Sequence, residues 1–332
     1  MKLCFEEIKN ITLGAADLRE TERGIAFFRC TKEQSDIYKE CGRLDIYEKT
    51  FHTAGVKLAF KTNSKKLFIA FDTPEMGEGT FFVEVLKNGE IIGELGVHKN
   101  HDNETSLNLD GKEFLLGDDE KEIEILLPYI IRTTLREIEL DDGASLSPKK
   151  LPKTILTIGD SITHGSVATR PSRRYAAKLA RALDADEHCL AVGSDFFREE
   201  LGKRKSPVEP DYVIVAYGTN DWGWIGREDF IRECNGFFNS ITKTYPTSKI
   251  FAVTPIWCKA YDTDEEHQIG KFPEFIELLK GIISKYPPVE IIDGTDLVPH
   301  DPKYFDGMCI HPTDEGFCFH AENLTKAIKE KL

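Results

Sequence analysis

One stretch decides the fold of the second half of this chain: Thr154-Ile155-Leu156-Thr157-Ile158-Gly159-Asp160-Ser161-Ile162-Thr163-His164-Gly165. Its first five residues are apolar or β-branched, which is typical of a buried strand, and the strand stops at a small polar turn. Open α/β sheets bind their ligands beyond the carboxyl ends of the strands. Ser161 directly follows the predicted strand, so its hydroxyl should lie at the edge of the sheet where ligands bind. Ser161 is therefore the first candidate nucleophile.

Size and charge limit the classes of protein to which the chain can belong. Its 332 residues exceed the usual size of one domain, so we expect two domains. With 43 basic and 57 acidic residues the net charge is -14, which disfavours nucleic acid and anionic membranes as partners. The start of the chain lacks a long apolar run, so the sequence predicts no signal peptide, no membrane span and a cytoplasmic location.

Metal and cofactor sites have no sequence signal. None of the eight cysteines forms a Cys-x-x-Cys pair, so reduced thiols are expected rather than a zinc site or disulfides. The glycines at 159 and 165 have the wrong spacing for a dinucleotide or phosphate loop. We therefore expect neither a metal nor a cofactor.

The first 140 residues consist of short strand-like segments separated by turns. Residues of high β-propensity mark segments 24–28, 56–60, 67–71, 81–85 and 122–127. Asn88-Gly89 is a strong hairpin signal between the segment ending at Leu86 and the one beginning at Glu90. This pattern predicts an antiparallel β-sandwich of the jelly-roll type. Residues 141–152 have the composition of a linker, which gives a β-sandwich domain at 1–145 and a second domain at 146–332.

Beyond the linker, short apolar strands alternate with helical segments. Strands are expected at 155–158, 189–192, 212–217, 250–253 and 290–292. Helical spacing of apolar residues marks the segments between them, for example Phe230, Cys234, Phe237, Phe238 and Ile241. Alternation of this kind predicts a parallel sheet with helices on both faces. The last helix should begin near Thr313, whose hydroxyl can cap it, so Asp314 in its first turn is given a structural role.

Three predicted strands end in residues suited to acyl transfer. The first ends at Ser161, the second at Gly193-Ser194, and the third at Gly218-Thr219-Asn220-Asp221. Parallel strands end at one edge of a sheet, so the backbone N–H of Gly193 and the side-chain amide of Asn220 can face Ser161. Acyl transfer also needs a base, and His311 lies in the loop just before the last helix. Together these residues predict a serine nucleophile, a histidine base and an oxyanion hole.

These segments resemble the four sequence blocks of the SGNH, or GDSL, hydrolases. Gly159-Asp160-Ser161, Gly193, Gly218-Thr219-Asn220-Asp221 and His311-Pro312 match the blocks in order, and the resemblance covers roughly residues 153 to 332. It implies a flavodoxin-like three-layer αβα domain. It also implies Ser161 as nucleophile, His311 as base, and an oxyanion hole made by the Ser161 and Gly193 amides and the Asn220 side chain. A β-domain in front of such a domain is similar to the layout of two-domain carbohydrate esterases.

One position departs from the family pattern. An aspartate usually stands three residues before the histidine, and here that position is Met308. Asp306 lies two residues earlier, and a local bulge would bring its carboxylate to His311 as the third member of a triad. Alternatively, a backbone carbonyl orients the imidazole and the protein works with a Ser-His dyad. The second block is also thin, because Gly193 is followed by Ser194 and has no flanking asparagine.

Further residues near the blocks have candidate roles. Asp160, Trp222 and Trp224 are predicted to bind substrate, although the two tryptophans, which flank a glycine beside Asn220, could equally be core residues. His320 falls on the interior face of the last helix, where we expect a core histidine with satisfied hydrogen bonds. His164 is assigned a surface or hydrogen-bonding role.

The resulting hypothesis is a metal-independent serine esterase that acts as a deacetylase on a carbohydrate or another small hydroxylated molecule. Within the same family the alternative is a lipase, lysophospholipase or thioesterase, against which we find no long apolar lid. From another class, the alternative is a non-catalytic carbohydrate-binding protein with a degraded SGNH domain, which Met308 supports. The sequence leaves open whether the protein forms a homo-oligomer.

Overall fold

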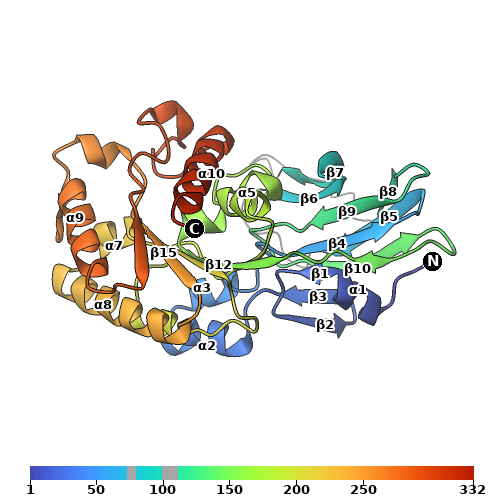
Figure 1. Ribbon diagram of the computed structural model, residues 1–332, viewed down its shortest axis with the longest axis horizontal. Coiled ribbons are helices and arrows are strands. Elements are labelled where there is room, and N and C mark those ends of the chain that lie inside the picture. Colours follow the sequence, from blue (N-terminus) through green and yellow to red (C-terminus); the bar gives the residue numbers. More distant parts are fainter. Residues whose placement is uncertain (73–79, 99–110) are drawn as a thin grey trace. The chain divides into compact units, whose positions relative to one another are not determined.

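A computed structural model describes residues 1–72, 80–98 and 111–332 (Figure 1). Packing divides the chain into two compact units. The first comprises Met1–Cys30, Glu48–Pro152 and Thr169–Ser172, and the second comprises Thr31–Tyr47, Lys153–Ala168 and Arg173–Leu332. Each unit therefore takes in one short segment from the other part of the sequence. The domain boundary between residues 145 and 146 stays a prediction.

The first unit contains two antiparallel sheets, which confirms the predicted sandwich; its jelly-roll type stays a prediction. One sheet has the order β1 (Thr12–Leu13), β4 (Lys57–Thr62), β9 (Lys121–Leu126), β6 (Thr80–Lys87) and β7 (Glu90–His98), with β11 (Ser147–Pro148) paired to β4. The other has the order β2 (Asp17–Thr21), β3 (Gly24–Phe28), β10 (Thr134–Leu140), β5 (Lys66–Asp72) and β8 (Lys112–Leu115). The predicted turn at Asn88-Gly89 joins β6 to β7, and both of its residues have positive φ.

The core of the first unit forms where the two sheets face each other. Phe60 and Ile123 of one sheet and Phe71 and Ile138 of the other are all fully buried in a single cluster. Helix α1 (Phe5–Ile11) adds Ile8 and Ile11 to this cluster. Burial of large apolar side chains from both sheets stabilises the unit by about 1.5–3 kcal/mol for each side chain.

The second unit is built on a five-stranded parallel sheet, as predicted. Its order is β13 (Ala185–Cys189), β12 (Lys153–Gly159), β14 (Tyr212–Ala216), β15 (Lys249–Val253) and β18 (Val289–Ile292). After β12 the chain forms β13 on one side of β12, and it then crosses to the other side of β12 to form β14. This reversal beside β12 is the flavodoxin-like switch point, where open sheets of this type bind ligands. Ser161 therefore follows the strand at which the strand order reverses.

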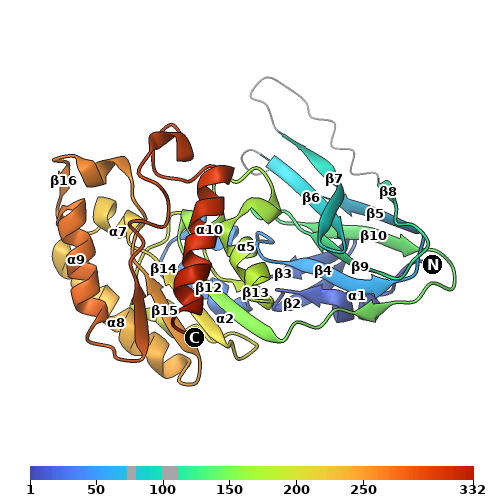
Figure 2. The same cartoon turned by 45° about the horizontal axis from the view of Figure 1, so that its top comes forward.

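Helices cover both faces of this sheet (Figures 1 and 2). On one face α5 (Tyr175–Ala182) packs against α10 (Asp314–Lys329), and on the other α8 (Arg227–Thr244) packs against α6 (Glu199–Gly202) and α9 (Phe272–Ile283). The predicted apolar face of α8, from Phe230 to Ile241, is buried. The remaining elements are α2 (Lys32–Glu40), α3 (Leu44–Lys49), α4 (Ser161–His164), α7 (Thr219–Trp224), β16 (Glu266–His267), β17 (Gly270–Lys271) and three short 3-10 helices at 171–173, 259–262 and 302–304.

The last helix begins as predicted. The Thr313 hydroxyl accepts a hydrogen bond from the backbone N–H of Gly316, and Asp314 and Glu315 occupy the first turn. Carboxylates there interact favourably with the helix dipole. This cap fixes where the loop that carries His311 stops and the helix starts.

Candidate active site

Ser161 occupies the first position of the single-turn helix α4, directly after β12. The side chain of Asp160 caps this helix by accepting a hydrogen bond of 2.9 Å from the N–H of Ile162. Gly159 is required just before the cap, because a Cβ there would lie 2.3 Å from Thr163 Oγ1 and 2.6 Å from the carbonyl of Ala216. The strand therefore runs close against its neighbour and turns sharply at the nucleophile.

A buried arginine holds the other end of α4. Arg174 Nε donates to the carbonyl of His164 at 2.8 Å, and its Nη2 donates to the carbonyl of Thr163 at 3.2 Å. The same guanidinium forms a 2.9 Å ion pair with Glu187 of β13, and both side chains are buried. A guanidinium suits this place because it can serve several acceptors in one plane. Sequence reasoning missed Arg174, which has no motif of its own.

His311 lies beside Ser161. Ser161 Oγ lies 2.8 Å from His311 Nε2, and His311 Nδ1 lies 3.0 Å from Asp306 Oδ2. When Nδ1 carries the proton and donates it to Asp306, Nε2 is left as an acceptor for the serine hydroxyl. The three side chains thus form one continuous chain of hydrogen bonds at the carboxyl edge of the parallel sheet.

A tight turn between Asp306 and His311 brings the carboxylate to the imidazole. Asp306 Oδ1 accepts hydrogen bonds from the N–H groups of Ile310 and His311, and Cys309 takes a left-handed φ of 57°. Burial works against ionisation, but the Ile310 N–H and the imidazole of His311 hold the pKa of Asp306 below its ordinary value. Of the two arrangements left open by the sequence, the structure contains the one with Asp306 beside His311.

Gly193 lies near the nucleophile, and Asn220 is hydrogen-bonded to the loop that contains Gly193. A Cβ placed on Gly193 would be 3.7 Å from Ser161 Cβ, so the loop after β13 passes close to the serine. Asn220, on α7, donates from Nδ2 to the carbonyl of Asp195 at 2.9 Å. An amide nitrogen has two hydrogens, so this bond engages one of them and leaves the other for a ligand.

The three residues predicted to bind substrate lie in different surroundings. Asp160 is buried, and its role as helix cap accounts for it without contact to a substrate; burial raises the pKa of Asp160 to about 7. Trp222 is 6% exposed, donates from Nε1 to the carbonyl of Gly270 and packs edge-on against Phe272, as a core residue does. Trp224 is 61% exposed.

Trp224 lines a surface groove of about 310 Å³ at the end of α7. The groove runs between the residues that follow the Gly193 loop and the start of α8. Its wall includes Phe196, Arg198, Glu200 and Arg232, and the guanidinium of Arg198 lies 4.3 Å from the centre of the Phe196 ring. The groove thus combines exposed aromatic surface with charged hydrogen-bonding groups.

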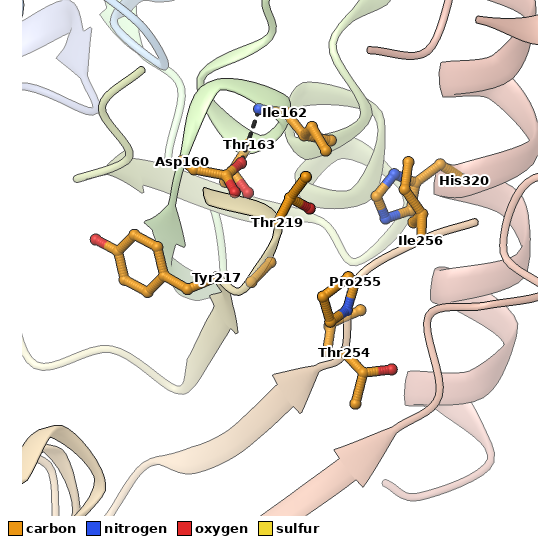
Figure 3. Close-up of a pocket in the computed structure, with 11 residues that line it drawn as sticks. Asp160, Ile162, Thr163, Tyr217, Thr219, Thr254, Pro255, Ile256 and His320 are labelled. Carbon is orange, nitrogen blue, oxygen red and sulfur yellow. Dashed lines mark hydrogen bonds between the residues drawn. The ribbon is translucent and has the colours of Figure 1, made fainter. Parts of the chain in front are cut away.

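His320 differs from the expectation of a satisfied core histidine. It is buried and stacks on Tyr175 with ring centres 3.9 Å apart, but neither ring nitrogen has a hydrogen-bond partner among the described residues. Burial lowers the pKa of His320 to about 3, so the ring is neutral. Its ring lines a cavity of about 20 Å³ with Asp160, Thr163 and Thr219 (Figure 3), which has room for about one water molecule.

His164 likewise is buried rather than at the surface. It is the last residue of α4, and its backbone carbonyl accepts a hydrogen bond from Arg174. Of the two roles assigned from the sequence, the surface role is therefore wrong. His164 lies next to Gly193, with Nδ1 4.0 Å from the Cβ position of that glycine.

The described residues show no membrane-spanning or metal-binding feature. No helix in that part of the chain is both long and apolar enough to cross a bilayer. Nor do three or more His, Cys, Asp or Glu side chains gather there in an arrangement that could hold a metal ion.

Residues 157–317 match the model of the GDSL-like lipase/acylhydrolase family. The family defines the class of protein as a carboxylic ester hydrolase of the GDSL type. No curated protein sequence matches the chain.

Solved structures of the same fold include both esterases and an acyltransferase. A salicylyl-acyltransferase from a tetracycline biosynthetic pathway is 21% identical over 96% of this chain and 94% of that one, with a TM-score of 0.79. A family two carbohydrate esterase from Cellvibrio japonicus is 15% identical over 98% and 96% of the two chains, with a TM-score of 0.67. An acetyl xylan esterase from the rumen bacterium Butyrivibrio proteoclasticus is 17% identical over 85% and 91%, with a TM-score of 0.57. Identities this low show a shared fold and no more.

Proposed function

We propose that the protein is a serine esterase that removes short acyl groups, above all acetyl, from a carbohydrate. The observation that supports this best is the unbroken chain of hydrogen bonds from Ser161 through His311 to Asp306. A serine at the carboxyl end of a strand, paired with a histidine that a carboxylate orients, is the arrangement that activates a hydroxyl for attack on an ester.

In the proposed reaction His311 takes the proton of Ser161 as Oγ attacks the ester carbonyl. Asp306 keeps the proton on Nδ1 and stabilises the imidazolium that forms. The backbone N–H groups of Ser161 and Gly193 and the side-chain amide of Asn220 hold the oxyanion, each donor contributing about 3 kcal/mol in the transition state. His311 then protonates the leaving alcohol, and it activates the water that releases the acid from the acyl-enzyme.

A carbohydrate as the alcohol part of the ester is supported by two observations. The fold of the whole chain is shared with carbohydrate esterases, although fold alone is a weak argument for a substrate. The groove beside α7 presents the exposed face of Trp224 together with Arg198 and Glu200. Aromatic faces pack against the apolar faces of sugar rings, while charged groups bind the hydroxyls, so we assign Trp224 to the sugar subsite.

The test compares the wild type with Ser161→Ala on p-nitrophenyl acetate. We expect the variant to lose at least about 10³-fold in kcat, while equal rates would leave the non-catalytic binding protein as the better account. Acetyl, butyryl and octanoyl esters then separate an acetyl esterase from a lipase, lysophospholipase or thioesterase. Faster turnover of the octanoyl ester or of phospholipids than of acetylated sugars would contradict the acetyl assignment.

A further inference from the structure

The segment from Gly193 to Asp195, here called the oxyanion loop, is linked to both of the oxyanion donors proposed outside α4. It contains one of them, the N–H of Gly193, and it hydrogen-bonds to the other, the side-chain amide of Asn220. Gly193 supplies its own N–H and passes within 3.7 Å of Ser161 Cβ, measured from the Cβ position of the glycine. The carbonyl of Asp195 accepts the 2.9 Å hydrogen bond that orients the amide of Asn220. The position of this one loop therefore sets the geometry of two donors at once.

The loop does not hold its shape by local preference. Ser194 has a φ of 70°, a left-handed conformation that costs a residue with a side chain about 1–2 kcal/mol. The backbone bond that closes the turn, from Asp195 N–H to the carbonyl of Val192, is long at 3.3 Å. Contacts with the rest of the unit must therefore keep the loop in place.

Those contacts come largely from a segment far away in the sequence. Tyr38, on α2, donates its hydroxyl proton to Asp195 Oδ2 at 2.6 Å, and Tyr217, directly after β14, donates to the same oxygen at 2.8 Å. Both rings and the carboxyl group are buried. Arg204 Nη1 donates to the Tyr38 hydroxyl at 3.1 Å, which orients that hydroxyl toward Asp195.

A second contact joins the same segment to the oxyanion loop. Arg43 Nη2 lies 3.4 Å from the carbonyl of Ser194, and its guanidinium also faces the ring of Phe196. Residues 31–47 thus belong to the compact unit that holds the active site, although they precede most of the β-sandwich in sequence. The hydrogen bonds from Tyr38 and Arg43 are made to the two residues that follow Gly193.

We propose that residues 31–47 are a positioning element for the oxyanion hole, acting through the hydrogen bond from the Tyr38 hydroxyl to Asp195. The phenol oxygen is the informative atom, because a phenylalanine would fill the same space and leave the carboxylate with one donor fewer. Tyr38 bonds to the carboxyl group of Asp195, so its proposed effect reaches the oxyanion hole through the position of the Asp195 carbonyl and of Asn220, which donates to that carbonyl. The inference rests on the proposed roles of Gly193 and Asn220.

The first test is Tyr38→Phe, assayed by kcat and KM on p-nitrophenyl acetate. We expect kcat to fall about tenfold with KM unchanged, short of the 10²–10³ that loss of a whole donor costs. The matched control is Tyr286→Phe, which removes a part-buried hydroxyl bonded to the carbonyl of Asn235 on α8, away from the oxyanion loop and from Arg204. Both variants should lose melting temperature, but only Tyr38→Phe should lose kcat. A kcat for Tyr38→Phe within twofold of the control would overturn the proposal.

A second test asks whether Tyr38 acts through Asn220. In an Asn220→Ala background the effect of Tyr38→Phe on kcat should shrink to about threefold or less, since one of the groups that it positions is gone. A full tenfold effect in that background would overturn the link. Ser161→Ala separates the two levels of the account: if that variant keeps wild-type activity, the proposed function fails, whereas loss of activity there with no effect of Tyr38→Phe refutes only the positioning role.

Discussion

Replacing Asp306 by asparagine should lower kcat by about 10³- to 10⁴-fold while leaving the fold intact. Asp306 Oδ1 accepts two backbone N–H groups, at 3.0 and 3.3 Å, which shape the turn that carries His311. Asparagine can keep this oxygen in place. Its NH₂ group would then face His311 Nδ1, where the carboxylate oxygen now lies at 3.0 Å. A donor at that place moves the proton of the imidazole to Nε2, which can no longer accept the proton of Ser161.

The magnitude follows from this change of tautomer. In serine proteases with a full triad the same substitution lowers kcat by about 10⁴ with the geometry preserved, which corresponds to about 5 kcal/mol. The assay is kcat on p-nitrophenyl acetate with the melting temperature measured in parallel. Asp301→Asn is the matched control, because Asp301 caps a turn of the same loop through the N–H of Lys303 and does not contact His311. A loss below about threefold for Asp306→Asn would show that Asp306 does not orient His311 and would favour a Ser-His dyad.

Three further predictions concern stability and the groove. Burial lowers the pKa of His320 from 6.5 to about 3. Between these two pH values the unfolded chain binds a proton on His320 that the folded chain does not, so the free energy of unfolding falls as the pH falls. Relative to the wild type, His320→Phe should therefore gain about 2 kcal/mol on going from neutral pH to about pH 5 in urea unfolding; a constant difference would contradict this. Arg174→Met leaves the buried Glu187 without its positive partner and should lower the free energy of unfolding by about 3–5 kcal/mol. A second change, Glu187→Leu, should restore most of this loss, and no recovery would count against a charge effect. Trp224→Ala should raise KM about tenfold for an acetylated oligosaccharide but not for p-nitrophenyl acetate, whereas Trp222→Ala should instead lower stability by about 3–5 kcal/mol, and the reverse pattern would exchange their roles.

The parallel sheet and the proximity of Ser161, Gly193 and His311 could be predicted from the sequence for one physical reason. Each residue follows a strand or precedes a capped helix, and parallel strands end at one edge, so order along the chain was enough to place them together. The antiparallel sandwich could be predicted for a similar reason, because segments rich in β-branched and aromatic residues and the turn at Asn88-Gly89 are local signals in the sequence.

The contact between Asp306 and His311 could not be decided in the same way. It depends on a turn with a left-handed Cys309, a conformation that no residue type in this segment requires. Trp222 and Trp224 stand two residues apart on a short helix, so spacing alone did not tell which one is buried. Tyr38 carried no signal at all, because its contact with Asp195 forms only when α2, from the start of the chain, becomes part of the unit that contains the catalytic sheet.

In the proposed reaction Ser161 becomes acylated with the help of His311. The most direct measurement is mass spectrometry of the protein quenched during turnover of p-nitrophenyl acetate, with the modified peptide sequenced. We expect one acetyl group per chain on the peptide that contains Ser161, little or none in His311→Ala, and none in Ser161→Ala. An acetyl group found on another residue, or full turnover by Ser161→Ala, would contradict it.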